Sequence, residues 1–193
     1  LGRIRTLALG KYRVSWGLGL VVNNDFSLGK LISLSTLGRN TTGVKTHSSL
    51  SSYNYQQGVA ADVSLSSRLN LSAFLSYRPI DATLNNNSPS IATILSTGYH
   101  RTKSELERKN NASQFTSGMR LGYTAGALRL GLNGLYTRFD HDLHPNLSQA
   151  FRRYYPQGNN FYNLSLDYSY THYRFTVKGE TALDHQQAVA TLN

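Results

Sequence analysis

The chain has 193 residues, no cysteine, a formal net charge of +10 at pH 7 and 39% hydrophobic residues. Its mean hydropathy is -0.38, and no segment approaches the ~20 apolar residues of a membrane-spanning helix. The absence of cysteine argues against a small secreted domain held by disulfides. The positive charge favours contact with lipopolysaccharide or polyanions, without identifying one.

The first regular pattern covers residues 4–22. Apolar residues from Tyr12 through Trp16 to Val22 occupy every second position, and Arg13 lies on the opposite row with small residues. A period of two predicts β-structure. A membrane crossing needs only about 9 to 11 residues, so this segment is either one unusually long strand or a hairpin divided at Gly10-Lys11.

Six further stretches alternate in the same way and pair into three hairpins with short turns at Ser66-Ser67, Gly126-Ala127 and Thr171-His172. Phe74 is the one large residue on an otherwise polar row. The apolar rows run from Val59 to Leu65, Leu69 to Tyr77, Met119 to Tyr123, Leu128 to Tyr136, Tyr162 to Tyr170 and Tyr173 to Val177.

The segments between these hairpins, 23–56, 79–114 and 140–159, are all long. Alternation of long and short connections is typical of outer-membrane β-barrels, with long loops outside the cell and short turns in the periplasm. We therefore expect an all-β fold, a transmembrane antiparallel up-and-down barrel. Within the second loop, residues 103–110 (KSELERKN) predict a short helix, and Ile91 to Leu95 should not form an extra crossing.

A soluble β-sandwich would also alternate, but its polar face usually mixes Lys and Glu, whereas here it carries Gly, Ser, Asn, Thr and Arg. The composition therefore favours the barrel. The chain shows no signal-peptide pattern, and residues 189–193 begin a strand. Because an incomplete sheet leaves open edges in lipid, we expect residues 1–193 to be part of one larger barrel domain in the outer membrane of a Gram-negative bacterium.

Aromatic residues near the strand ends are expected to form the belts that mark the two membrane interfaces. The outer belt would contain Tyr77, Phe115, Tyr136 and Tyr162, and the inner belt Tyr123, Tyr168, Tyr170 and Tyr173.

Four segments of the chain carry a resemblance to known proteins: residues 10–30 (GKYRVSWGLGLVVNNDFSLGK), 77–82 (YRPIDA), 98–109 (GYHRTKSELERK) and 178–182 (KGETA). They resemble stretches of a group of Bacteroidota outer-membrane proteins. Those proteins carry a competence-protein-like helix-hairpin-helix region before a long β-rich region, and the similarity covers only the β-rich part. The family pattern has Gln where Leu18 stands here. The resemblance implies location and fold; without a helix-hairpin-helix motif, DNA binding is carried over to no residue.

Strand alternation assigns more basic than acidic side chains to the inward rows. The basic candidates are Arg13, Arg68, Arg78, Arg120, Arg129, Arg174 and Lys178, and the acidic candidates are Asp62, Asp167 and Glu180. These residues could line a pore that attracts anions. Alternatively, they pair across neighbouring strands or bind a plug that fills the interior.

Two functions follow from these alternatives. The first is a channel or translocation component with a basic lumen, for anionic or polymeric cargo. The second is a structural or assembly barrel with a plugged interior, which docks other outer-membrane or periplasmic proteins. A hydrolase is a distant third, because no Ser and His spacing indicates a catalytic pair. We expect no enzyme activity and no cofactor. His100 with Glu105, and Asp140 to His144, are the tightest loop clusters, but loop residues of this kind are usually solvated rather than metal-bound.

Overall fold

The computed structural model describes residues 3–23, 43–47, 54–86, 88–148, 150–152, 155–186 and 188–193. In this part of the chain one sheet of eleven strands accounts for the fold, with one short α-helix beside it. The strands are β1 (Ile4–Ser15), β2 (Gly43–Thr46), β3 (Gln56–Ser64), β4 (Leu69–Ile80), β5 (Ala82–Leu84), β6 (Ile91–Ile94), β7 (Ala112–Ala125), β8 (Leu128–Leu143), β9 (Gly158–His172), β10 (Phe175–Asp184) and β11 (Val189–Leu192). The expected all-β fold is confirmed.

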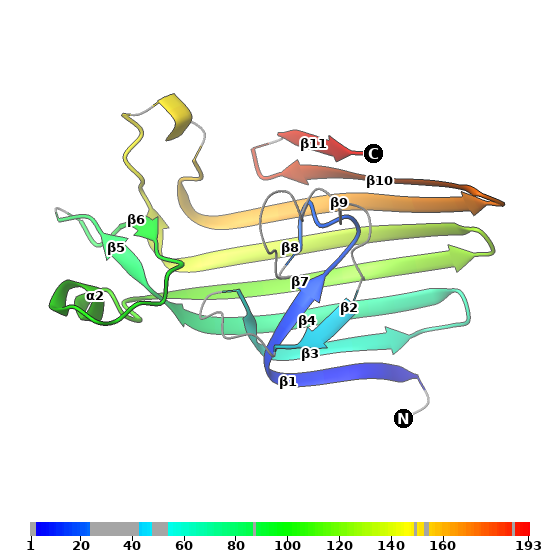
Figure 1. Ribbon diagram of the computed structural model, residues 1–193, viewed down its shortest axis with the longest axis horizontal. Helices are drawn as coiled ribbons and strands as arrows, with labels where there is room; N and C mark the ends of the chain where they lie inside the picture. The colour runs from blue at the N-terminus through cyan, green and yellow to red at the C-terminus, as the bar shows by residue number, and fades with distance from the viewer. Residues whose placement is uncertain are drawn as a thin grey trace.

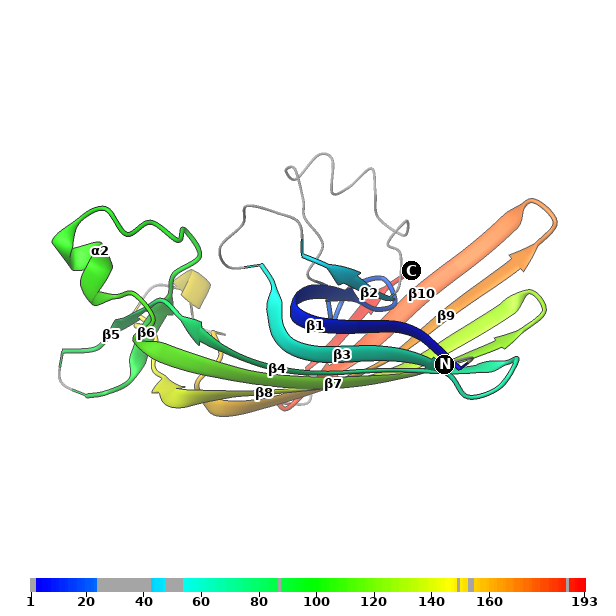
Figure 2. The same ribbon diagram turned by 90° about the horizontal axis from the view of Figure 1, so that it is seen from below.

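Strand order in the sheet is β11-β10-β9-β8-β7-β4-β3-β1-β2, with antiparallel neighbours throughout this path. The sheet curves into a trough, and part of β1 and all of β2 lie on its concave side (Figure 2). Among the described strands none joins β11 to β2, so the sheet is not closed into a barrel.

The three short turns lie at one end of the sheet, and the long connections that carry α2, β5 and β6 lie at the other (Figure 1). Two turns fall where the sequence predicts them, after β3 and at Gly126-Ala127. The third is shifted: β9 continues through His172, and the turn is Tyr173-Arg174. Tyr173 adopts a left-handed φ of 49° there.

The connection after β4 makes no extra crossing, because β4 pairs directly with β7. Residues Ile91–Ile94 instead form β6, which pairs with β5 in a small hairpin at the end of the sheet. The loop predicted at 23–56 contains β2, and most of its other residues lie outside the described part of the chain. The strands β8 and β9 extend into the loop predicted at 140–159.

The short helix α2 (Lys103–Glu107) lies within the predicted helical segment. Its N-terminus has a capping box: the Thr102 hydroxyl accepts a hydrogen bond from the Glu105 backbone nitrogen, and the Glu105 carboxylate accepts one from that of Thr102. No helix in the described residues is long and apolar enough to cross a membrane.

The N-terminal segment is a single strand followed by a turn. Strand β1 runs without interruption past Gly10, whose φ of +93° accommodates a bend that leads the strand across the concave face. A tight turn then follows, in which the Trp16 backbone nitrogen donates to the Val22 carbonyl over 3.0 Å. Of the two sequence alternatives, the hairpin divided at Gly10-Lys11 is therefore wrong.

Candidate functional site

The convex face of the sheet is apolar and exposed along its whole width. Leu75, Leu164 and Leu166 are each 53% exposed, although leucine is normally buried in a packed protein. Leu71 and Leu130 share this face through the pairing of Leu71 with Leu121 and of Leu130 with Tyr123. Other exposed members are Leu7, Leu9, Val59, Met119, Leu121, Leu132, Val177 and Leu183. A patch of this extent is typical of a surface that another apolar phase or partner covers.

The predicted aromatic belts lie as bands across neighbouring strands. Near the long connections Tyr77 pairs with Phe115, and Tyr136 pairs with Tyr162. The rings of Phe115 and Tyr136 meet edge to face, with centroids 6.4 Å apart. Near the short turns Tyr123 and Tyr168 both pair with Leu130, and Tyr170 pairs with Leu128. Tyr173, in the turn itself, is 92% exposed.

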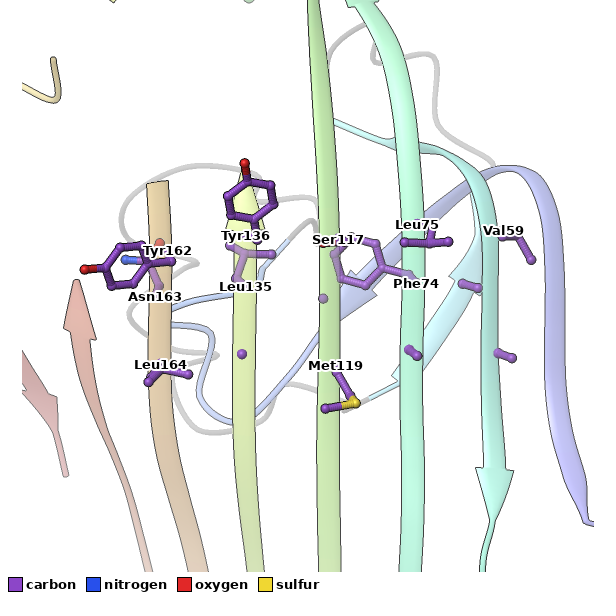
Figure 3. Close-up of a pocket in the computed structure, with 15 residues that line it drawn as sticks. Val59, Phe74, Leu75, Ser117, Met119, Leu135, Tyr136, Tyr162, Asn163 and Leu164 are labelled. Atoms are coloured by element: carbon purple, nitrogen blue, oxygen red, sulfur yellow. The ribbon is translucent and has the colours of Figure 1, made fainter. Parts of the chain in front are cut away.

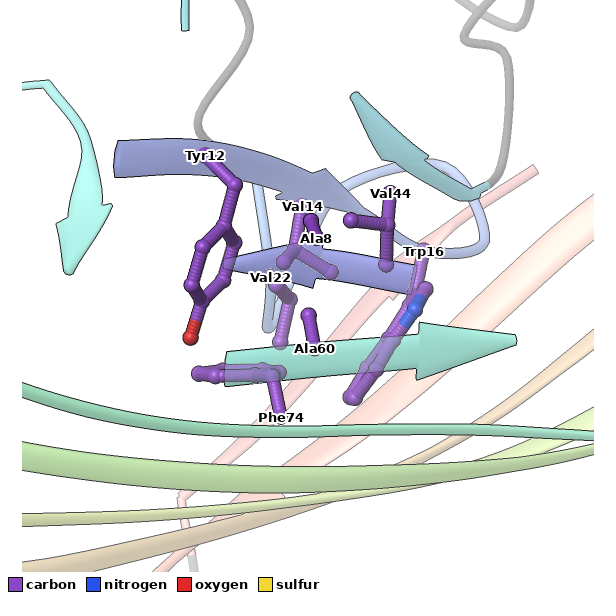
Figure 4. Packing of buried hydrophobic residues seen from close by; sticks show 8 residues of the cluster. All are labelled: Ala8, Tyr12, Val14, Trp16, Val22, Val44, Ala60 and Phe74. Atoms are coloured by element: carbon purple, nitrogen blue, oxygen red, sulfur yellow. The ribbon is translucent and has the colours of Figure 1, made fainter. Parts of the chain in front are cut away.

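The N-terminal apolar row faces inward, which corrects the parity expected from the sequence. Tyr12, Val14 and Trp16 are buried against Phe74 on the concave side (Figure 4). Leu7 and Leu9, on the alternate positions of the strand, are exposed. The pattern alone could not distinguish the two faces because both sides of β1 carry apolar residues. The inward row packs well because the bend at Gly10 brings it over the sheet.

Phe74 anchors this cluster and explains its presence on a polar row. Its ring lies 5.4 Å from that of Trp16 and 6.3 Å from that of Tyr12, centroid to centroid. The ring extends over Gly118 of β7, where an added Cβ would come within 2.4 Å of it. The Tyr12 hydroxyl donates to the Leu75 carbonyl over 2.8 Å, which satisfies its buried polar atom.

The turn after β1 rests on a buried carboxylate. Both the Leu18 and the Leu20 backbone nitrogens donate to Oε2 of Glu180 on β10, at 2.7 and 3.1 Å. Oε1 of Glu180 accepts from the Ser165 hydroxyl over 2.7 Å, and the side chain is fully buried. Gly17 has a φ of +56°, and a Cβ there would lie 2.8 Å from Glu180 Oε2. Glycine is therefore required both by the turn and by the close approach of the carboxylate.

A chain of polar contacts continues from Glu180 across the concave face. Asn133 Nδ2 donates to the Ser165 hydroxyl and to Asp167 Oδ2, each over 2.9 Å. Arg120 Nη2 donates to Asp167 Oδ1 over 3.0 Å, and Nη1 forms a second contact with Oδ2 of the same carboxylate. The side chains of Arg120 and Asp167 are only 12% and 13% exposed. The two charges are thus paired in a partly desolvated position.

Gly131 makes this ion pair possible. Arg120 lies on β7 and Asp167 on β9, so the guanidinium must pass over the intervening strand β8. Gly131 occupies the position on β8 opposite Asp167, and a Cβ there would lie 2.3 Å from atoms of both charged groups. The absence of a side chain on β8 opens the path between them. The alternation pattern identified the inward row but not this pairing.

The other predicted basic residues do not form a continuous cationic lining. Arg78 bonds to Gln114 Oε1 at the long-connection end, and its guanidinium lies 5.3 Å from the Tyr55 ring centroid. Arg129 and Lys178 are exposed on the inward parity of their strands. Two assignments to the inward rows are wrong, because Arg68 and Arg174 lie in exposed turns. Arg13 lies on the face of β1 opposite the residues packed against Phe74.

Asp62 is the remaining acidic candidate, and the structure places it on the concave face. Its Oδ2 accepts a hydrogen bond from the Val44 backbone nitrogen of β2 over 3.3 Å, and its Oδ1 contacts the Ser72 hydroxyl. All three predicted acidic residues therefore have partners in the interior, and two of them, Asp62 and Glu180, accept backbone N–H groups from the N-terminal quarter of the chain.

The loop clusters form pairs rather than a larger site. His100 Nε2 lies 2.7 Å from Asp81 Oδ2, and His141 Nδ1 lies 2.9 Å from Asp140 Oδ1. Glu105, which the sequence groups with His100, instead caps α2. Within the described ranges no group of three or more His, Cys, Asp or Glu side chains is placed to hold a metal ion.

Comparisons with known proteins add no assignment to this geometry. The chain matches no family model, no curated protein and no solved structure.

Proposed function

We propose that this chain forms part of the wall of an outer-membrane β-barrel whose interior is filled by its own N-terminal turn and that serves as a structural or docking component. The observation that carries this proposal is the opposite character of the two faces. Leu75, Leu164 and Leu166 face outward, whereas buried polar groups of Ser76, Asn133 and Glu180 face inward on the same sheet. A soluble two-layer protein has the reverse arrangement, with its apolar face buried.

The contacts on the concave face support a packed interior. The guanidinium of Arg120 is neutralised by Asp167, and the carboxylate of Glu180 is used to hold the turn at Leu18 and Leu20. Trp16 and Phe74 fill the space between this turn and the sheet. Side chains that are already bonded to one another are poor ligands for a passing solute, so these contacts favour the structural role over transport.

Site-directed fluorescence tests the membrane proposal. Because the chain contains no cysteine, single cysteines can be introduced at Leu130 and Leu164 on the convex face and at Asn163 on the concave face. After labelling and reconstitution into vesicles that contain brominated lipids, the labels at Leu130 and Leu164 should be quenched. The label at Asn163 is the matched control on the neighbouring position and should be quenched much less. Equal quenching at the three positions, or none at Leu164, would contradict the proposal.

One observation favours a channel as a second candidate. Arg5, Arg120 and Arg129 line an open basin of about 590 Å³ at the short-turn end of the concave face. Asp167 already neutralises Arg120, so Arg129 should provide more of any attraction for anions. In a planar bilayer, anion-selective conductance that weakens in Arg129→Gln would support transport. Absence of conductance from the inserted protein would support the packed interior.

A further inference from the structure

The convex face contains a groove that the wall itself does not require. It has a volume of about 680 Å³ and spans strands β3, β4, β7, β8 and β9. Small residues open it: Gly134 has no side chain between Met119 and Leu164, and Ser117 lies between the larger Leu75 and Tyr136. Figure 3 shows the side chains of Leu75, Met119, Tyr136 and Leu164 around this hollow. Its surface is almost entirely apolar, which suits a hydrocarbon chain.

A cation lies directly beyond one end of the groove. Arg138 follows Tyr136 by two positions on the same face of β8, which corresponds to about 7 Å along the strand. Its side chain is exposed and is opposite Phe115 on β7 and Asn160 on β9. Within the described residues no acidic side chain forms an ion pair with it, because Asp140, the next acidic residue along this face, pairs with His141.

Aromatic and amide groups separate the cation from the apolar hollow. The Tyr136 hydroxyl donates to Asn160 Oδ1 over 2.7 Å, and Tyr162, on the neighbouring strand, is 57% exposed beside it. Rings with an apolar body and a polar hydroxyl are typical of the boundary between lipid tails and headgroups. Along the convex face of β8 the order is therefore the cation at Arg138, the amphipathic ring of Tyr136 and the apolar groove at Gly134.

We propose that this line of residues binds one anionic membrane lipid, with a phosphate oxygen accepting hydrogen bonds from Arg138 and an acyl chain lying in the groove at Gly134. Arginine is suited to phosphate because its planar guanidinium can donate two parallel hydrogen bonds. The positive charge of Arg138 selects an anionic headgroup. The groove holds the acyl chain of the bound lipid, so this lipid should exchange more slowly than the surrounding ones. The inference rests on the membrane location proposed above, and it adds a specific ligand class to that wall.

Native mass spectrometry of the detergent-solubilised protein, titrated with phosphatidylglycerol or phosphatidylcholine, tests the proposal. The unmodified protein should retain phosphatidylglycerol preferentially. Arg138→Gln should weaken its binding by roughly tenfold, the loss expected for one charged hydrogen-bonding contact, while Arg138→Lys should keep part of the preference. Equal retention of the two lipids by the unmodified protein, or unchanged retention in Arg138→Gln, would overturn the headgroup assignment.

A second variant tests the groove independently. A Cβ at Gly134 would lie 3.5 Å from Leu164 Cδ2, an ordinary contact, so Gly134→Leu should fold and place its side chain in the hollow. It should lower retention of phosphatidylglycerol, whereas Thr181→Leu, which introduces the same leucine side chain at an exposed position on β10, should not. Equal retention by Gly134→Leu and Thr181→Leu would overturn the groove assignment.

These outcomes are separable from a failure of the proposed function. If the protein inserts into vesicles but Arg138→Gln and Gly134→Leu retain lipid as the unmodified protein does, only the lipid site is wrong. If the labels on the convex face are not quenched by brominated lipid, the membrane location itself is wrong.

Discussion

The carboxylate of Glu180 lies 2.7 Å from the backbone nitrogen of Leu18, although 162 positions separate the two residues in the chain. This contact closes the N-terminal turn onto β10, near the opposite edge of the sheet from β1. A fully buried carboxylate needs several donors, and here the turn supplies two of them. The turn and the distant strand therefore depend on each other for hydrogen bonding.

Replacing Glu180 should release this turn. In Glu180→Ala the nitrogens of Leu18 and Leu20 lose their acceptor, at a cost of about 1–3 kcal/mol for each group that stays buried. Trp16, the only tryptophan in the sequence, reports the change because it is buried beside Phe74. We expect its emission to shift to the red and its quenching by acrylamide to increase.

Glu180→Gln is the matched control for that experiment. Glutamine has a similar shape and retains one carbonyl acceptor for the turn, so Trp16 should remain more protected than in Glu180→Ala. If Trp16 emission and quenching are the same in the unmodified protein and in Glu180→Ala, the carboxylate does not hold the turn.

The ion pair over β8 leads to a second prediction. A methyl group in Gly131→Ala would meet both Arg120 and Asp167 at 2.3 Å, so the two charged groups must move apart. Separation of a buried pair costs up to about 3–5 kcal/mol, and the free energy of unfolding in detergent should fall accordingly. Gly134→Ala on the same strand is the control, since its methyl group would meet only ordinary contacts. If Gly131→Ala and Gly134→Ala have the same free energy of unfolding, the Arg120–Asp167 pair accommodates the methyl group without a loss of stability.

Much of the sheet could be predicted from the sequence because a period of two is a local property. Leu164 and Leu166 are separated by one polar residue, and this spacing alone places them on one face. The α2 helix lies within the segment 103–110 that the sequence predicts, because helix formation depends on residues close together in the chain. The third turn was predicted two residues too early, at Thr171-His172, because these two residues are as polar as Tyr173-Arg174, which form the turn.

The interior could not be predicted in the same way, because its contacts join residues that are distant in sequence. Nothing near Glu180 in the chain indicates that Leu18 is its partner. One signal was available: isolated glycines within strands, such as Gly118 and Gly131, indicate close approach of another group. Here those groups are the Phe74 ring and the Arg120 guanidinium. The face of the Tyr12 and Trp16 row was misassigned because apolar residues occur on both sides of β1, as Leu7 and Leu9 show.

The cap of α2 should respond to acid. Hydrogen bonds from the Arg101 backbone nitrogen, and then from that of Thr102, lower the pKa of Glu105 below its ordinary value. A lowered pKa in the folded state contributes stability above the ordinary pKa and loses it as pH falls through the lowered one. Hydrogen exchange of residues 101–110 should therefore be protected at neutral pH and lose protection as the pH falls below the ordinary pKa of a glutamate, after correction for the intrinsic rate. Glu105→Gln should remove this pH dependence; a variant that keeps it would assign the effect to another group.

Arginine substitutions on the convex face test how deeply each position lies in lipid. Leu164 is exposed on β9, within the span between the two aromatic bands, so under the proposed membrane location an arginine there would lie in the hydrocarbon region. Leu164→Arg should lower the free energy of unfolding from vesicles by about 2–4 kcal/mol, the usual cost at mid-membrane depth. Tyr173→Arg is the matched control, because Tyr173 lies in a turn, outside the strands, and should change stability little. The comparison separates lipid from water because both positions are exposed in the protein and, in the proposed wall, lie at different depths. If Leu164→Arg is as stable as Tyr173→Arg, the convex face contacts water or a polar partner, and the barrel wall is the wrong interpretation of this sheet.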